Sequence, residues 1–211
     1  MIRFVSFEGG DGTGKTTQIH ALENFLLQQG LSCVVTREPG GTSLGKLIRR
    51  LLLEIGDQDI PPSTELFLYL ADRAQHVNEI IRPALAAGKI VLCDRFTDST
   101  LAYQGYGRGI DLKLLGQLNN VADDGVRPDL TFLLDCPVSE GLGRTSHRPN
   151  VEGQPREDRF EHETLDFHEK IRSGFLIMAR ANPARFRVID SSRSKDEVSR
   201  EIVRIAEQEI L

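Results

Sequence analysis

Short apolar runs alternate along the chain with longer amphipathic segments. The apolar runs are five or so residues long and lie at residues 2–7, 33–36, 89–94, 129–135 and 185–190. Most of them are continuous rather than alternating in polarity, which is typical of strands buried on both faces of a parallel sheet. The pattern therefore predicts five strands of that kind.

The segments between the runs carry apolar residues at intervals of three and four, the spacing of one helix face. We interpret each set as a stripe that packs on the core, rather than as a binding face. The sets are Ile19, Leu22 and Leu26; Leu44, Leu47, Ile48, Leu51, Leu52 and Ile55; Phe167, Ile171, Phe175 and Met178; and Val198, Ile202 and Ile205.

Strands and helices in alternation predict an α/β fold of three layers, with a five-stranded parallel sheet flanked by helices and ligands at the carboxyl ends of the strands. At 211 residues, the chain fits one domain over residues 1–211. Residues 144–158 are rich in proline, glycine and charge and lack apolar periodicity. We expect this segment to be an exposed loop that serves as a mobile lid, with an ordinary surface loop as the alternative.

Composition narrows the class of protein. The formal net charge of −5 argues against general binding of nucleic acid, which needs a basic surface. No apolar stretch is long enough to cross a membrane and the N-terminus does not resemble a signal peptide, so we expect a cytoplasmic protein without a membrane partner. Cys33, Cys93 and Cys136 are widely separated and lie in apolar runs, so we interpret them as reduced core residues rather than disulfide or metal ligands.

Residues 9–16 match the phosphate-binding loop pattern G-x-x-x-x-G-K-S/T, between the first predicted strand and the first predicted helix. Glycines let successive backbone N–H groups point at phosphate oxygens, and the helix N-terminus adds partial positive charge. Lys15 would reach the β- and γ-phosphates of a nucleotide, and the Thr16 hydroxyl would bind Mg²⁺. The rest of the expected nucleotide-phosphate site is Gly9, Gly10, Asp11, Gly12, Thr13 and Gly14, which would bind ATP if the donor is that nucleotide.

Polar residues at the end of the third predicted strand suggest a second anion site. Asp94 could hold a water on Mg²⁺, and the guanidinium of Arg95 could bind another anion in bidentate fashion. The alternative is a surface ion pair. Arg49 and Arg73 lie on predicted helices, where either solvent or a ligand could face them.

Six segments in order along nearly the whole chain resemble the motifs of bacterial thymidylate kinases. They are FEGGDGTGKTTQ from residue 7, TREPGGT from 36, ELFLYLADRAQH from 65, CDRFTDSTLAYQGYGRG from 93, RPDLTFLLD from 127 and DRFE from 158. The resemblance implies transfer of the γ-phosphoryl group of ATP to dTMP with Mg²⁺, on the fold of nucleoside monophosphate kinases. It also implies a homodimer.

The resemblance assigns roles to charged residues near the acceptor phosphate. It implies that Arg49, Arg73 and Arg95 surround the dTMP phosphate, and that Asp11 and Glu38 lie near the sugar and the metal ion. The peptide bond that follows Glu38 is expected to be cis.

At the other end of the acceptor site, the resemblance places Gln104 on the thymine edge, Thr100 beside the base and Tyr103 against the deoxyribose. Tyr69 stands where family members usually have a phenylalanine that stacks on the base. Its ring can still stack, but its hydroxyl needs a partner.

The lid departs further from the family, because it is longer than expected and contains two prolines. The glycine-rich loop carries no arginine, so by the resemblance a lid arginine supplies positive charge to the transition state. Arg148 is the first candidate and Arg156 the second, and Arg144 is expected to bind ATP.

The chemistry needs no general base, because a phosphomonoester has its second pKa near 6 and is mostly dianionic at neutral pH. Two other functions stay open at this stage. One is a kinase for a related monophosphate such as dUMP, which lacks only a methyl group. The other is a regulatory GTPase, which is disfavoured because residues 119–124, NNVADD, lack the lysine of a guanine-specifying NKxD motif.

Overall fold

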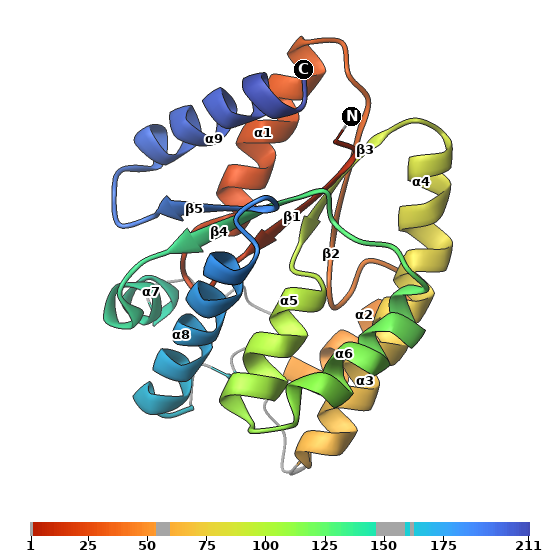
Figure 1. Ribbon diagram of the computed structural model, residues 1–211, viewed down its shortest axis with the longest axis vertical. Coiled ribbons are helices and arrows are strands. Elements are labelled where there is room, and N and C mark those ends of the chain that lie inside the picture. The colour runs from red at the N-terminus through yellow and green to blue at the C-terminus, as the bar shows by residue number, and fades with distance from the viewer. Residues whose placement is uncertain (1, 54–59, 147–158, 161–162) are drawn as a thin grey trace, which may run out of the picture.

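The computed structural model describes residues 2–53, 60–146, 159–160 and 163–211. Within them lies a five-stranded parallel sheet in the order β2-β3-β1-β4-β5 (Figure 1). The strands are β1 (Phe4–Glu8), β2 (Cys33–Arg37), β3 (Ile90–Asp94), β4 (Leu130–Asp135) and β5 (Phe186–Asp190). Each falls within one residue or two of a predicted apolar run, so the predicted sheet is confirmed.

Helices join the strands and cover both faces of the sheet (Figure 1). Two π-helical segments, η1 and η2, continue α3 and α5 respectively without a break. The segments are α1 (Lys15–Gln28), α2 (Ser43–Leu53), α3 (Pro62–His76), η1 (Val77–Ile81), α4 (Arg82–Ala86), α5 (Thr97–Thr100), η2 (Leu101–Gly107), α6 (Leu112–Asp123), α7 (Val138–Ser146), α8 (Leu165–Ala181) and α9 (Lys195–Glu209).

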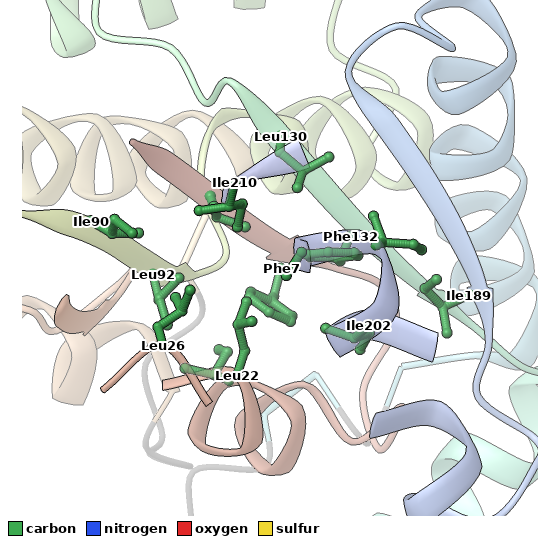
Figure 2. Packing of buried hydrophobic residues seen from close by; sticks show 14 of the residues in the cluster. Phe7, Leu22, Leu26, Ile90, Leu92, Leu130, Phe132, Ile189, Ile202 and Ile210 are labelled. Carbon is green, nitrogen blue, oxygen red and sulfur yellow. The ribbon is translucent and has the colours of Figure 1, made fainter. Parts of the chain in front are cut away.

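One face of the sheet packs against α1 and α9. Alternate residues of a strand point to opposite faces, so Val5 and Phe7 of β1 enter this layer while Phe4 enters the other. Leu22 of α1 and Ile202 of α9 are buried in the same cluster as Phe7 (Figure 2). The apolar stripes predicted for these two helices are thus core stripes.

The opposite face is covered by α8 and η2 beside β4 and β5, and by η1 and α4 beside β1 and β3. Phe167, Ile171 and Phe175 of α8 are buried there, which confirms the predicted stripe of that helix. Because η2 is held between α8 and α6, the polar residues that it carries have fixed positions.

The prediction for α2 was partly wrong. Ile48 and Leu52 are buried as expected, but Leu44, Leu47 and Leu51 are 46%, 50% and 58% exposed. The six-residue pattern covers more than one face of the helix, and only the face of Ile48 and Leu52 meets the core. Ile55, the last residue of the predicted stripe, lies outside the described residues.

The predicted lid also began too early. Helix α7 continues through Ser146, so the first residues of the segment 144–158 are helical. Arg144 lies within salt-bridge distance of Glu140 one turn earlier, and the Thr145 hydroxyl donates to Leu142 O, so this last turn has its own stabilising contacts. The rest of the predicted lid, residues 147–158, lies outside the described residues.

The three cysteines are free thiols, as predicted, with Cys93 and Cys136 buried and Cys33 half-buried. The Glu38–Pro39 peptide is cis, as the resemblance implies. No helix within the described ranges is long and apolar enough to cross a membrane.

Candidate nucleotide site at the carboxyl edge of the sheet

The glycine-rich loop joins β1 to α1 at the carboxyl edge of the sheet. Gly9, Gly12 and Gly14 have φ angles of 134°, 73° and 90°, a region that L-residues with a side chain rarely adopt. At Gly9 a Cβ atom would collide with the Leu134 carbonyl oxygen, and at Gly12 with that of Gly141. Backbone conformation and close packing therefore both require glycine at Gly9 and Gly12.

Lys15 opens α1 and folds back over the loop. Its Nζ donates to the carbonyl oxygens of Gly10 at 2.8 Å and Gly9 at 3.2 Å. Burial, together with the neighbouring Arg95 charge, lowers its pKa to about 8. The ammonium group is thus desolvated and held at the centre of the loop, where a phosphate would meet it.

The hydroxyl of Thr16 donates to Asp94 Oδ2 at 2.9 Å, across from the end of β3. The pair offers a hydroxyl and a carboxylate, which are hard oxygen donors suited to Mg²⁺. No group of three or more histidine, cysteine or acidic side chains that could hold a metal exists within the described ranges. A cation here would need phosphate oxygens and water as further ligands, which is the usual arrangement for Mg²⁺ in nucleotide sites.

Arg95 follows β3 in a left-handed conformation, with φ at 70°. Its guanidinium donates to Gly9 O and to Asp11 Oδ1, at 2.8 and 2.7 Å, and lies 5.0 Å from the Tyr103 ring centre. Tyr103 in turn donates its hydroxyl to Asp11 Oδ2 at 3.1 Å. Although burial opposes it, the positive charge of Arg95 and then of Lys15 lowers the pKa of Asp11.

Glu8, for which the sequence predicts no role, stabilises the turn that carries Arg95. This residue is fully buried, and its carboxyl group accepts from the backbone N–H of Phe96 at 2.8 Å and from Ser99 Oγ at 2.6 Å. Burial, and then the negative charge of Asp98, raises the pKa of Glu8 to about 8. The sequence did carry a signal for it, since it is an acidic residue at the end of an apolar run.

An open cavity lies between the loop and the ends of β2 and β3. Many of the residues predicted for the nucleotide sites line this cavity. Arg37, for which the sequence predicts no role, lines it as well. The predicted residues that line it are Asp11, Gly12, Gly14, Lys15, Thr16, Glu38, Arg49, Asp94 and Arg95. Among the described residues, four cations, three of them arginines, thus face one space.

Arg73 does not line this cavity. It is 1% exposed, and its guanidinium donates to Glu38 Oε2 at 2.8 Å and to Thr100 Oγ1 at 2.9 Å. His76 bonds the other oxygen of Glu38 at 2.8 Å. The structure thus places Arg73 between Glu38 and the predicted base site, and its contact with a phosphate stays a prediction.

Residues predicted for the base lie on α5, η2 and α3. Thr100 and Gln104 are 2% and 1% exposed, and Gln104 Nε2 donates to Glu65 Oε1 at 2.9 Å. Tyr69 is half-buried and packs against the apolar cluster that contains Tyr103. Burial raises the pKa of Tyr69, and within the part of the chain described here its hydroxyl makes no hydrogen bond.

Arg144 is the only predicted lid arginine within the described residues. It is partly exposed near the end of α7, and its Nη1 donates to Ser191 O at 3.0 Å, in the turn between β5 and α9. Arg148 and Arg156 lie outside the described residues. The described arrangement can thus bind polyphosphate at the loop and a second anion near Arg95 and Arg49.

Comparison with known proteins gives a consistent family. Residues 7–202 match the family model described as thymidylate kinase. The chain is 53% identical to a thymidylate kinase of Geotalea uraniireducens over 92% of this chain and 91% of that one, and 53% identical to one of Desulfovibrio desulfuricans over 92% and 90%. A solved thymidylate kinase from Ehrlichia chaffeensis superposes with a TM-score of 0.77 at 38% identity, covering 97% of this chain and 98% of that one.

The buried carboxyl group of Glu8 generates a prediction about stability and pH. Because its pKa is higher in the folded protein than the ordinary 4.5, the folded state binds more protons, so its contribution to stability falls as pH rises from about 4.5 to 8. Glu8→Gln removes this titration and keeps an acceptor for Phe96 N–H. We expect its Tm to exceed that of the wild type by roughly 2–8 °C at pH 9, about 1–2 kcal/mol, and by less at pH 5.

Thermal unfolding at several pH values measures this difference, with Glu207→Gln on the exposed end of α9 as the control. Curves for Glu8→Gln and wild type that run parallel from pH 5 to 9 would show that Glu8 is ionised in the folded protein.

Proposed function

Because the chain belongs to the thymidylate kinase family and phosphorylates dTMP with ATP, we propose that the two nucleotides meet in the cavity between the glycine-rich loop and Arg95. One observation carries this assignment. Lys15, at the start of α1, and Arg95, in the turn after β3, both line this cavity, so each can hold one of two phosphate groups that must come into contact.

On the donor side, the loop amides and Lys15 bind the β- and γ-phosphates, and Arg144 lies near the nucleoside of ATP. The reaction is expected to need a divalent cation, and we propose Mg²⁺, with the Thr16 hydroxyl as ligand and Asp94 acting through a water. When bound, this ion neutralises charge on the β- and γ-phosphate oxygens.

On the acceptor side, Arg49 and Arg95 hold the dTMP phosphate. One of its oxygens attacks the γ-phosphorus, the bond from that phosphorus to the β,γ-bridging oxygen breaks, and ADP leaves with the electron pair. The phosphate is already mostly dianionic at neutral pH, so no side chain has to remove a proton. The protein's task is to hold two anions in line against their repulsion, which positioning and fixed positive charge achieve.

The remaining assignments concern the nucleoside of dTMP and the lid. We place the deoxyribose against Tyr103, whose hydroxyl is held by Asp11, and thymine between Tyr69, Thr100 and Gln104. One of Arg148 and Arg156 is proposed to supply charge to the transition state.

We further propose that the protein is a cytoplasmic homodimer. Helix α3 packs against both α2 and α6, and these three helices lie together on one side of the molecule (Figure 1). The exposed leucines of α2 follow one another at intervals of three and four residues, so they form one apolar face. Further exposed apolar side chains on this side are Phe67, Leu112, Leu114 and Val121.

An assay of ADP release tests the function directly. With ATP and Mg²⁺, we expect rapid ADP formation with dTMP and slower use of dUMP, by about 10–200-fold in kcat/KM for the missing methyl group. Guanosine and adenosine monophosphates should give only background. Equal ADP release with and without dTMP would contradict the assignment.

Replacing the loop lysine tests the donor site. Lys15→Ala is expected to lower kcat by about 10³-fold or more, because it removes a fixed charge from the transferring phosphate. Its Tm should not fall, since burial of the ammonium group is costly, as its lowered pKa shows. The exposed Lys89→Ala, at the other edge of the sheet, is the matched control in steady-state kinetics. Turnover by Lys15→Ala near the wild-type level would place the phosphates elsewhere.

Light scattering after size exclusion tests the dimer. Leu47→Glu should shift the protein from about 47 kDa towards the monomer mass of 23.6 kDa, because it places a charge in an apolar interface. Leu27→Glu on α1, at a residue of almost equal exposure outside this surface, should remain dimeric. A monomeric wild type would remove this part of the proposal.

A further inference from the structure

A fully buried carboxylate lies behind the proposed base site. Glu65 of α3 is 0% exposed and has three partners from two other parts of the chain. Its Oε1 accepts from Gln104 Nε2 at 2.9 Å, and its Oε2 forms salt bridges with Arg108 at 3.3 Å and with Arg159. None of these contacts belongs to the phosphate chemistry described above.

The two arginines fix Glu65 itself. The Arg159 side chain also donates to Leu52 O. Arg108 lies over the Phe167 ring at 4.6 Å and forms a second salt bridge, with Glu163, at 2.7 Å. With partners on both oxygens, the carboxylate of Glu65 has little freedom to rotate.

This fixed carboxylate determines which way the Gln104 amide points. A carboxylate paired with two guanidinium groups accepts hydrogen bonds and donates none, so it must face the NH₂ side of the amide. The carbonyl oxygen Oε1 of Gln104 is therefore turned away from Glu65. It takes no hydrogen bond from the residues that the structure describes.

We infer that Glu65 is a specificity-determining positioning residue, which holds Gln104 so that the amide presents an acceptor to the base. This rests on the proposed function, in which Gln104 meets the thymine edge. Thymine and uracil have one donor on that edge, N3–H, which matches an acceptor. Cytosine has a lone pair at N3, which would face the Gln104 oxygen and be repelled.

Kinetics with dTMP, dUMP and dCMP test the inference. The wild type should prefer dUMP to dCMP by about 100-fold in kcat/KM, because the two differ only along this edge and one hydrogen bond becomes a repulsion. In Glu65→Gln the new amide can donate or accept, so Gln104 populates both orientations. We expect the ratio of dTMP to dCMP efficiency to fall about 10-fold or more through the nucleotide KM, with kcat for dTMP and KM for ATP within about threefold of wild type.

Two further variants make the result decisive. Glu65→Asp keeps a charge for Arg108 and Arg159 but withdraws it from Gln104, so it should shift the ratio in the same direction even if Glu65→Gln does not fold. Glu163→Gln makes the same chemical change at the other carboxylate on Arg108 and should leave the ratio unchanged.

The outcomes separate this inference from the proposed function. If Gln104→Leu alters the ratio but both Glu65 variants leave it within about twofold of wild type, Glu65 does not orient the amide and the inference is wrong. If Gln104→Leu has no effect on KM for dTMP, thymine lies elsewhere and the proposed base site is wrong. Wild type that uses dCMP as well as dUMP would also overturn the inference.

Discussion

Close packing of the glycine-rich loop against its neighbours is the constraint on which the rest of the site depends. The loop leaves the central strand of the sheet, and at Gly9 and Gly12 its backbone touches the carbonyl groups of Leu134 and Gly141 directly. Neither contact leaves room for a methyl group, so both positions require glycine for the loop to keep the conformation described above. That conformation orients the N-terminus of α1, and with it Lys15, towards the end of β3.

The positive charge of Arg95 is positioned through contacts with this loop. Arg95 is held to Gly9 O and Asp11, and the turn that carries it is supported by Glu8 through Phe96 N–H and Ser99. Fixed positions for the cations matter in phosphoryl transfer, because the protein has little covalent chemistry to perform and acts by placing charge. A cation that is already desolvated and oriented needs no reorganisation when the substrates bind.

The sequence predicts some features of the fold and of the site, but not others. The five strands and the loop at residues 9–16 follow from apolar runs and a motif, both of which are local along the chain. Burial of Leu44, Leu47 and Leu51 was predicted wrongly, because periodicity shows that a face is apolar but does not show what covers it. Glu8 and Glu65 were not selected at all, since their partners are 39 to 94 residues away and only the folded chain brings them together.

The network around Glu65 has an evolutionary consequence. One buried carboxylate accepts from the Gln104 amide and pairs with the guanidinium groups of Arg108 and Arg159. A change at Glu65 or at either arginine therefore alters the balance of charge inside the protein, and a change at Gln104 removes a hydrogen-bond donor from the carboxylate. Single substitutions there would be selected against in descendants of this chain. Positions 65, 104, 108 and 159 should accordingly drift as a set, and lineages that have altered one should carry compensating replacements at the others.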